Sequence, residues 1–330
     1  MAEGLVFGKF YPFHKGHDAL IRFAAEQVEL LHVLVCCSDR ELIEPAVRLQ
    51  WLQEAYAGDA RISVEVYHYE ETALANSSVP SEGVSAAWAE VFASLFPALD
   101  LLVTSEAYGP MVARVLGIRH MLFDMERQQQ PWSGTALRNG LLEAAPGLMP
   151  ACRDYFHRKV VLLGTESSGK TTLAGRLSQH FNQPMVRELG RELIPDSSQF
   201  DVQDLQKVAH AHAKAIKEAM EGKPLLLLID TDLHITQSYA KHFFGSYLEL
   251  DPTVYQSNRA DLYLYLDASV PFVQDGTRLD EQSRNALDRS HRETLQAFGI
   301  DYIVLEGSYA QREERAIQLI RKLFEHRWYA

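Results

Sequence analysis

Residues 164–171 of this 330-residue chain carry the groups needed to bind a nucleoside triphosphate. They read GTESSGKT, which fits G-x-x-x-x-G-K-[ST], and they lie between an apolar strand-like run at 159–163 and a helical stretch at 173–181. In such a loop the backbone N–H groups surround the phosphates, the lysine reaches the β- and γ-phosphates, and the threonine hydroxyl helps to bind Mg²⁺. A chance glycine turn is the alternative, but every fixed position and both flanks match. The residues expected to bind ATP here are Gly164, Thr165, Glu166, Ser167, Ser168, Gly169, Lys170, Thr171 and Thr172.

Carboxylates elsewhere in the second half suit phosphoryl transfer to a small acceptor. Asp230 follows a buried apolar run (225–229) and is expected to hold Mg²⁺ together with Thr171. Glu188 follows a short strand-like segment, where its carboxylate could take the proton of an acceptor hydroxyl. Arg191 and Asp232 are expected to contact that acceptor.

Two further arginines, Arg278 and Arg284, lie in a polar, glycine-containing stretch of the kind that closes over phosphates. They would offset charge on the transferred group, although a solvated helix face is an equal alternative for each. Hydrolysis is disfavoured because Thr231, and not a water-activating glutamate, follows Asp230. Residues 257–261 (SNRAD) match a guanine-reading motif poorly and precede a strand, so a GTPase is rejected. The second half is therefore predicted to be a small-molecule kinase.

A different phosphate site is predicted in the first half, where residues 8–17 (GKFYPFHKGH) join the first strand to the first helix. The pattern H-x-G-H at this junction is typical of nucleotidyltransferases, which attach AMP or CMP to a phosphate. His14 and His17 can both face the helix N-terminus, where N–H groups and the helix dipole favour an anion. An acceptor phosphate is already ionised near pH 7, because its second pKa is about 6. The chemistry then needs alignment and charge neutralisation, and no protein base.

The alternatives for these histidines are two ordinary loop residues or half of a metal site, for which no third ligand is evident. A second loop favours the nucleotidyltransferase. Residues 132–138 (WSGTALR) follow the fifth expected strand and open a helix. They resemble the S-x-T-x-x-R loop with which the same superfamily binds the outer phosphates of ATP, so Ser133, Thr135 and Arg138 are expected to do so here.

The elements that must position these residues alternate short apolar strands with amphipathic helices, which predicts two α/β domains, each a doubly wound parallel sheet. In the first half we expect strands at 4–9, 32–37, 62–67, 101–104 and 118–123, and helices at 19–30, 47–57, 85–95 and 135–143. In the second half we expect strands at 159–163, 225–229 and 262–266. Two prolines and a glycine in 144–150 interrupt any helix, so the boundary is placed at 145–157 and the domains at 1–150 and 151–330. The two halves open with different loops, which indicates fusion and not duplication.

Composition excludes several classes of protein. The chain is 47% hydrophobic and 23% charged, with a formal net charge of −12, which excludes a disordered chain and argues against a non-specific nucleic-acid binder. Cys36, Cys37 and Cys152 have no metal-binding spacing, so reduced thiols and a cytoplasmic location are expected. No apolar run approaches the ~18 residues that span a bilayer. A glycine-rich motif stands where a secretory leader would need an apolar stretch, so no membrane association is expected.

Taken together, the motifs resemble the bifunctional nicotinamide-mononucleotide adenylyltransferase/ribosylnicotinamide kinase family of the NadR type. The likeness covers nearly the whole chain through GKFYPFHKGH, TSEAYG (104–109), WSGTALR, GTESSGKTT, RELGRE (187–192), IDTD with the following HITQSYAKHFFG, and QDGTRLDEQSR (274–284). The resemblance implies that the second domain phosphorylates nicotinamide riboside (NR) to the mononucleotide (NMN). It further implies that the first domain joins NMN to AMP from ATP, giving NAD⁺ and pyrophosphate. ATP would be a substrate of both domains and Mg²⁺ the metal.

By position, the resemblance assigns His14 and His17 to catalysis. It assigns Gly8, Lys9, Phe10 and Lys15 to ATP binding in the same domain. Trp88 would stack on the nicotinamide ring, with a core position as the equal alternative. Tyr108 would lie at the end of the fourth strand, where substrates bind in such sheets.

Two departures from the family pattern bear on function. Ala107 stands where the TSEAYG motif often carries proline. The chain starts at its first catalytic strand, so the DNA-binding role that some members have through a helix-turn-helix is not expected. Two other readings remain, a nucleotide-sensing regulator with the same folds and the same two chemistries on a different acceptor. A homo-oligomer is left open.

Overall fold

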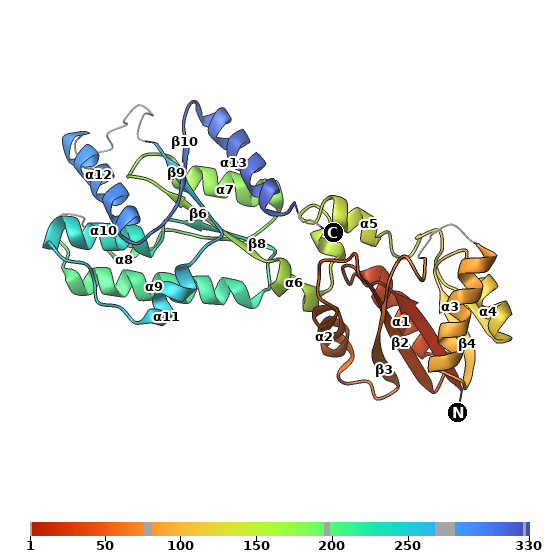
Figure 1. Cartoon of the computed structure of the whole chain (residues 1–330). Coiled ribbons are helices and arrows are strands. Elements are labelled where there is room, and N and C mark those ends of the chain that lie inside the picture. Colours follow the sequence, from red (N-terminus) through yellow and green to blue (C-terminus); the bar gives the residue numbers. More distant parts are fainter. Residues whose placement is uncertain (1, 76–80, 195–198, 268–280, 326–327) are drawn as a thin grey trace. The chain divides into compact units, whose positions relative to one another are not determined.

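The computed structural model describes residues 2–75, 81–194, 199–267, 281–325 and 328–330. The chain divides into two compact units, the first Met1–Arg153 with His326–Ala330 and the second Asp154–Glu325. Each unit contains a five-stranded sheet whose paired strands are all parallel, with helices on both faces (Figure 1). The doubly wound α/β architecture expected from the sequence pattern is therefore confirmed in both halves.

The units differ from the expected domain ranges 1–150 and 151–330 at two places. Helix α6 (Pro150–Phe156) spans the boundary, so residues 151–153 belong to the first unit. Residues 328–330 also belong to the first unit, because their backbone bonds to residues 40–42 and their rings contact Tyr11.

Unit 1 has the strand order β3-β2-β1-β4-β5. Its strands are β1 (Glu3–Gly8), β2 (Leu30–Ser38), β3 (Ile62–Tyr69), β4 (Leu99–Thr104) and β5 (Arg119–Leu122). Helices α1 (Lys15–Ala25) and α2 (Pro45–Tyr56) cover one face, and α3 (Glu82–Leu95) and α4 (Gly109–Leu116) cover the other. The strand order reverses at β1, and a ligand site is expected at the carboxyl end of such a strand.

The core of unit 1 forms where the apolar central strands meet α3. Leu5 of β1 and Leu34 of β2 are fully buried in one cluster with Trp88 and Phe92 of α3. The three cysteines are buried free thiols, as expected. This packing fixes the carboxyl end of β1, from which the first phosphate loop leaves.

The helices of unit 1 differ most from their expected bounds at α1 and α5, and α4 was not predicted. Helix α1 begins at Lys15, four residues before the expected start, because the His14 side chain caps its N-terminus. The usual capping residues are Ser, Thr, Asp and Asn, so the sequence pattern did not reveal this start. Helix α5 (Gly134–Asn139) ends at Gly140, a residue with low helix propensity, and not at 143.

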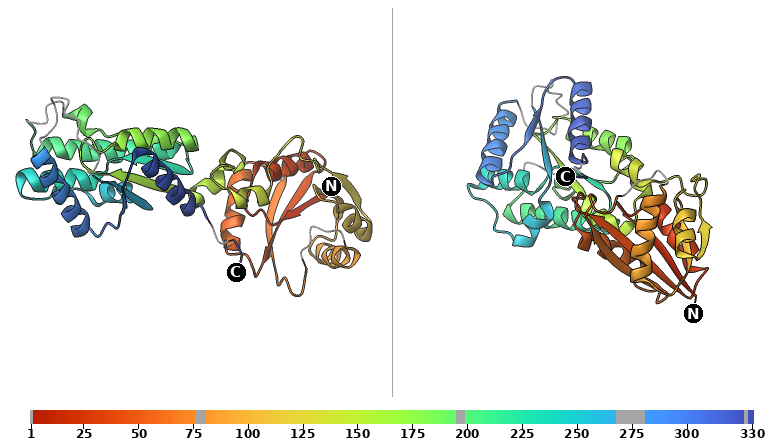
Figure 2. Two further views of the ribbon diagram at one scale, coloured as in Figure 1. Left: turned by 90° about the horizontal axis from the view of Figure 1, so that it is seen from above. Right: turned by 45° about the vertical axis from the view of Figure 1, so that its right-hand side comes forward.

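Unit 2 has the strand order β10-β9-β6-β8-β7. Its strands are β6 (Arg158–Leu163), β7 (Met185–Val186), β8 (Leu226–Asp230), β9 (Leu262–Leu266) and β10 (Ile303–Leu305). Helices α7 (Lys170–Phe181) and α13 (Tyr309–Leu323) lie on one face, and α9 (Val202–Glu221), α10 (Leu233–Phe244) and α11 (Pro252–Asn258) on the other (Figures 1 and 2). Helix α8 (Gly190–Leu193) follows β7, and α12 (Glu281–Ala297) packs on α10. Strand β10 was not predicted, because three residues are too few to show a period.

None of the helices within the described residues is long and apolar enough to cross a membrane.

Candidate active sites

A cavity of about 1190 Å³ opens at the carboxyl end of the unit 1 sheet, around the loop that follows β1. All but one of the residues expected to bind ATP or catalyse in this unit line it, namely Gly8, Lys9, Phe10, His14, His17, Ser133, Thr135 and Arg138. The exception is Lys15, which is exposed at the first turn of α1 and is not among the lining residues. The fold thus brings together two loops that are more than a hundred residues apart in sequence.

His14 is almost fully buried and forms the N-cap of α1. Its Nδ1 accepts hydrogen bonds from the backbone N–H of Gly16 at 3.1 Å and of His17 at 3.4 Å. An accepting Nδ1 leaves the ring proton on Nε2, which can donate to a ligand. A Cβ on Gly16 would stand 3.0 Å from the His14 ring and from the Trp132 carbonyl oxygen, so glycine allows the two loops to approach.

The second histidine stacks on the first, with ring centroids 3.6 Å apart. Burial lowers the pKa of His14 to about 3 and holds the pKa of His17 well below its usual value. The positive charges of Arg127 and Arg138 act in the same direction on both. Both imidazoles are therefore neutral at neutral pH, and the positive charge of the cavity comes from the arginines and Lys9.

Arg138 connects the two phosphate loops. Its Nη1 donates to the Tyr11 carbonyl oxygen at 2.6 Å and its Nη2 to Thr135 Oγ1 at 3.1 Å. Ser133 is the N-cap of α5 and accepts from the Ala136 N–H at 3.1 Å. The guanidinium is consequently held in the cavity lining together with Thr135, and the assignment of this loop to a triphosphate stays a prediction.

The sequence pattern missed Arg127, which also lines the cavity. Its Nη1 donates to the Trp132 carbonyl oxygen at 2.9 Å, and its Nη2 lies 3.5 Å from a Glu106 carboxylate oxygen. Arg127 stands five residues before the WSGTALR loop in a run of glutamines, where no motif pointed to it.

Lys9 lines this cavity and two further hollows of unit 1. Its Nζ is 3.0 Å from Glu41 and 3.7 Å from Glu71. Burial acts to lower the pKa of Lys9, but the charge and hydrogen bond of Glu41 outweigh it, so the pKa is raised. Lys9 therefore stays charged at neutral pH.

A smaller cavity of about 620 Å³ adjoins these residues between β1 and α3. Both residues expected to contact the acceptor, Trp88 and Tyr108, line it together with Gly8 and Lys9. Trp88 is mostly buried, and its Nε1 donates to the Ala75 carbonyl oxygen at 3.1 Å. Trp88 thus belongs to the core and at the same time presents part of its ring to the cavity.

The phosphate-binding loop of residues 164–171, here called the P-loop, leads from β6 into α7, as expected. Lys170 is mostly buried, and its Nζ donates to the Thr165 carbonyl oxygen at 2.9 Å. Gly169 has φ of +92°, and a Cβ there would stand 2.9 Å from the Tyr309 ring. Glycine is therefore required at Gly169 by both backbone conformation and space.

Thr171 and Asp230 form the candidate Mg²⁺ site. The Thr171 hydroxyl donates to Asp230 Oδ2 at 2.5 Å, and Asp230 is fully buried at the end of β8. Among the described residues no group of three His, Cys, Asp or Glu side chains is placed to hold a metal. One hydroxyl and one carboxylate still fit Mg²⁺, which takes most of its ligands from phosphates and water in such sites.

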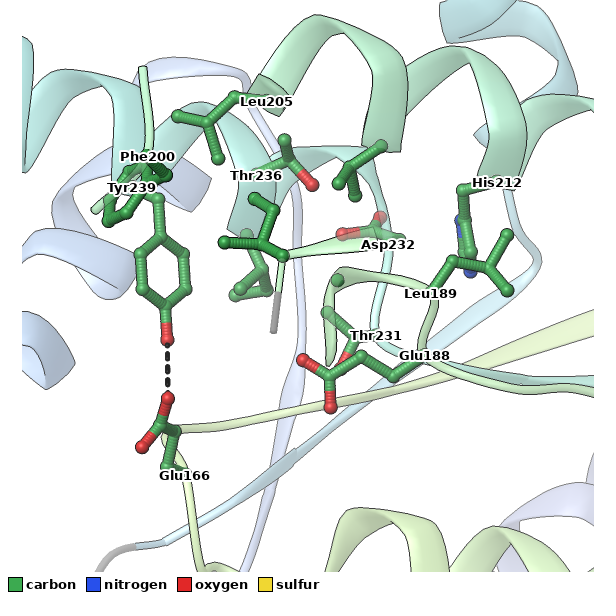
Figure 3. A pocket seen from close by; sticks show the side chains of 14 residues that line it. Glu166, Glu188, Leu189, Phe200, Leu205, His212, Thr231, Asp232, Thr236 and Tyr239 are labelled. Carbon is green, nitrogen blue, oxygen red and sulfur yellow. Dashed lines mark hydrogen bonds between the residues drawn. The ribbon is translucent and has the colours of Figure 1, made fainter. Parts of the chain in front are cut away.

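A pocket of about 700 Å³ lies beside the P-loop (Figure 3). Its walls combine apolar side chains with the carboxylates of Glu166, Glu188 and Asp232. Thr231 has φ of +67°, and this turn lets Asp230 face the P-loop while Asp232 faces the pocket. In Figure 3 the side chain of Glu188 lies next to that of Thr231, and the side chain of Asp232 lies farther along the pocket.

Asp232 has partners within the protein. It caps α10 by accepting the His234 N–H at 2.9 Å, and its Oδ2 lies 2.6 Å from His234 Nδ1. Burial acts to lower the pKa of His234, but the Asp232 charge outweighs it, so the pKa is raised. This engagement holds the Asp232 carboxylate in a fixed orientation at the pocket wall.

The structure places the three arginines that were expected at the kinase site differently. Arg278 lies outside the described residues. Arg191 is in α8, and its side chain lies outside what the structure describes. Arg284 is on α12, mostly buried, and does not line the pocket. Phe200, His212 and Tyr239 line it but were not predicted, because they come from separate elements without a shared motif.

Comparison with known proteins identifies a family model within unit 2 and relatives that align with nearly the whole chain. A family model described as an AAA domain matches residues 159–312. Two curated relatives are named trifunctional NAD biosynthesis/regulator protein NadR. The relative from Salmonella typhimurium is 31% identical over 342 residues and that from Escherichia coli 32% over 343 residues. Each alignment covers 97% of this chain and 83% of the relative.

Two solved structures also resemble the whole chain. One is a NadR protein in complex with NR, with a TM-score of 0.59, and the other a NadR protein in complex with NAD and AMP-PNP, with a TM-score of 0.57. Both are 22% identical to this chain and cover 99% of it and 97% of their own length. At that identity they show the shared fold.

Proposed function

The chain belongs to the NadR family, and on this premise we propose that it catalyses two consecutive reactions of NAD⁺ formation. Unit 2 transfers the γ-phosphoryl group of ATP to a hydroxyl of NR, giving NMN and ADP. Unit 1 transfers AMP from a second ATP to the phosphate of NMN, giving NAD⁺ and pyrophosphate. The product of unit 2 is then the acceptor for unit 1.

One observation carries this proposal, namely the different chemical make-up of the two phosphate sites. The unit 2 pocket places the carboxylates of Glu188 and Asp232 beside the P-loop, which suits an acceptor that must lose a proton. The unit 1 cavity places two neutral imidazoles beside Arg127 and Arg138, which suits an acceptor that is already an anion. A hydroxyl acceptor in unit 2 and a phosphate acceptor in unit 1 fit these surroundings.

In the kinase reaction, Glu188 takes the proton of the NR hydroxyl as its oxygen attacks the γ-phosphorus. The bond between that phosphorus and the β–γ bridging oxygen breaks, and ADP leaves with the electron pair. Lys170 offsets the charge that develops on the β- and γ-phosphates. Bound at Thr171 and Asp230, Mg²⁺ would supply further charge neutralisation. Asp232, fixed by His234, accepts a hydrogen bond from the substrate and orients it.

In adenylyl transfer, an oxygen of the NMN phosphate attacks the α-phosphorus of ATP, and the bond to the departing pyrophosphate breaks. No proton has to be removed. The Nε2–H of His14 donates to a phosphate oxygen. His17, whose ring stacks on that of His14, donates to the same developing charge. Lys9 and Arg138 offset the charge on the pyrophosphate, so the site works by alignment and by electrostatic stabilisation.

The experiment that tests the proposal is mass spectrometry of the products formed from NR and Mg-ATP. We expect NMN to appear first and NAD⁺ to follow. Free phosphate and ADP without either product would identify an ATPase. Both phosphorylated and adenylylated products from another nucleoside, with none from NR, would retain the two chemistries and change the acceptor. ATP binding without turnover of any acceptor would identify a nucleotide sensor.

A further inference from the structure

Residues 328–330, here called the 328–330 segment, pack on unit 1 although they follow α13 of unit 2 in sequence. The Trp328 carbonyl oxygen accepts the Leu42 N–H at 3.1 Å, and the Ala330 N–H donates to the Arg40 carbonyl oxygen at 2.8 Å. Tyr329 and Glu41 form an antiparallel bridge between these two bonds. The segment is therefore attached to residues 40–42, at the end of β2, like a short added strand.

The segment also contacts the first phosphate loop, through Tyr11. The Tyr11 hydroxyl donates to the Trp328 carbonyl oxygen and accepts the N–H groups of Leu42 at 2.9 Å and Ile43 at 3.1 Å. The Tyr11 ring lies 5.5 Å from the ring of Trp328 and 5.6 Å from that of Tyr329, measured between centroids. Tyr11 is only 1% exposed, so the loop between β1 and α1 rests on the segment.

The second phosphate loop is contacted as well, through Arg138. Trp328 Nε1 donates to the Arg138 carbonyl oxygen at 3.2 Å. The Tyr329 ring centroid lies 5.8 Å from the Arg138 guanidinium carbon and 5.6 Å from Lys9 Nζ. One aromatic ring thus interacts with two cations, each from a different loop of the cavity.

We propose that the 328–330 segment is a positioning element of the adenylyl-transfer site, in which Trp328 and Tyr329 hold Lys9 and Arg138 in the arrangement that binds the ATP phosphates. The inference rests on the proposed function in one respect, that these two loops bind ATP. It adds residues from the far end of the sequence to a site that motifs place within 8–138.

The physical reason is the repulsion between two cations that must approach the same triphosphate. An aromatic face attracts each of them and keeps them near the cavity without neutralising either. The base of the arrangement is rigid, since Arg48 and Glu41 form a fully buried ion pair of 2.6 Å and Arg48 donates to the Lys9 carbonyl oxygen at 3.1 Å. Without the segment, the Arg138 side chain would lose its ring contact and the loops would lose their common support.

An autoinhibitory role, in which the segment covers the cavity, is the competing interpretation. Lys9 and Arg138 line the 1190 Å³ cavity, whereas neither Trp328 nor Tyr329 does. Tyr329 instead lines a separate hollow with Lys9, Arg40 and Glu71. The segment therefore contacts Lys9 and Arg138 from outside this cavity and leaves the cavity accessible.

The decisive measurement is the affinity of the full chain for AMP-PNP, followed by tryptophan fluorescence. All four tryptophans, at positions 51, 88, 132 and 328, belong to unit 1, and Trp132 lines the cavity, so the signal reports this site and not the P-loop. We expect Trp328→Ala/Tyr329→Ala to raise the Kd about tenfold. The matched control is Leu95→Ala, an exposed apolar residue of unit 1 at the end of α3, which should leave the Kd unchanged.

A series at position 329 separates positioning from packing. Tyr329→Phe keeps the ring and should retain the wild-type Kd, whereas Tyr329→Leu keeps bulk without a π face and should raise the Kd about threefold. In NAD⁺ formation from NMN, we expect the double variant to raise KM for ATP and to leave kcat within about twofold of wild type. NR phosphorylation should be unaffected.

An unchanged or lower Kd in the double variant would overturn the proposal. A lower Kd would indicate autoinhibition. Equal Kd values for Tyr329→Phe and Tyr329→Leu would reduce the segment to packing alone and would also overturn it. If AMP-PNP binding depends on the segment but NMN is not converted to NAD⁺, the acceptor assignment of the proposed function fails and the positioning role stands.

Discussion

Under the proposed function both candidate sites bind a triphosphate, but the side chains around it differ. In unit 2, the P-loop adjoins the carboxylates of Glu188 and Asp232 at the pocket, and its Thr171 contacts Asp230. In unit 1, buried neutral imidazoles stand among Lys9, Arg127 and Arg138. Under the proposed function the difference teaches that the ionisation state of the acceptor determines the site, because a hydroxyl requires a carboxylate to remove its proton whereas a phosphate requires none.

The largest expected effect comes from the P-loop cation. Lys170→Ala should reduce NR phosphorylation about a thousandfold, because the charge developing on the outer phosphates loses its stabilising partner. Adenylyl transfer to NMN should be unchanged. Initial rates of both reactions, measured with saturating acceptor, check this, and Lys217→Ala on the exposed face of α9 is the matched control. Loss of both activities would contradict two independent sites.

The carboxylate side of the comparison is tested by Glu188→Gln. We expect NR phosphorylation to fall several hundredfold, because the amide keeps the size of the side chain but cannot accept the hydroxyl proton. Adenylyl transfer should be unchanged. Glu192→Gln, an exposed carboxylate four residues away, is the control. Near wild-type rates of NR phosphorylation in Glu188→Gln would show that another group of the pocket acts as the base.

The imidazole side is tested by His17→Ala. We expect NAD⁺ formation from NMN to fall about a hundredfold, as when one preorganised donor to a developing charge is removed. NR phosphorylation should not change. His68→Ala, an exposed histidine of β3, should affect neither reaction. Wild-type adenylyl transfer in His17→Ala would show that the His17 ring has no role in the reaction.

The smallest expected effect concerns stability and pH. The pKa of His14 is lowered to about 3 in the folded protein, whereas the unfolded chain titrates near the usual value of 6.5. Between these values the unfolded state binds more protons, so the free energy of unfolding decreases as the pH falls from 6.5 toward 3. His14→Asn keeps an N-capping acceptor without a titrating group.

We therefore expect His14→Asn to reduce the acid-induced fall in the Tm of unit 1 between pH 7.5 and 5 by roughly 3 °C. Tryptophan fluorescence reports this transition, since all four tryptophans are in unit 1. His68→Ala should leave the slope of Tm against pH as in the wild type. An unchanged slope in His14→Asn would show that His14 titrates near its usual pKa in the folded state.

The parts of the molecule that could be predicted from sequence are those in which neighbours along the chain are also neighbours in space. The P-loop and the two loops of unit 1 are turns between a strand and a helix, so their spacing alone encodes their geometry. The doubly wound fold followed from the alternation of apolar strands with amphipathic helices. The capping role of His14 did not follow, because histidine is rare as a cap and its ring orientation depends on the loop.

The residues that escaped prediction come together only in the folded chain. Phe200, His212 and Tyr239 belong to three segments, and their approach depends on how α9 and α10 pack. The hydrogen bond between Tyr11 and Trp328 joins residues 317 positions apart, a separation at which no local pattern carries information. Acceptor pockets and long-range supports are for this reason the parts of a site that motifs leave open.

The attachment of the 328–330 segment to unit 1 has a consequence for biosynthesis on the ribosome. Unit 1 emerges first, but the partner of its Tyr11 hydroxyl is made only after all the described residues of unit 2. Domains fold largely in order of synthesis. Unit 1 therefore folds without the hydrogen bond between Tyr11 and Trp328 while unit 2 is translated. A ribosome that stops within unit 2 would release a first half in which Tyr11 and Arg138 lack their contacts with the 328–330 segment, so under our proposal the adenylyl-transfer site is completed only when unit 2 has been made.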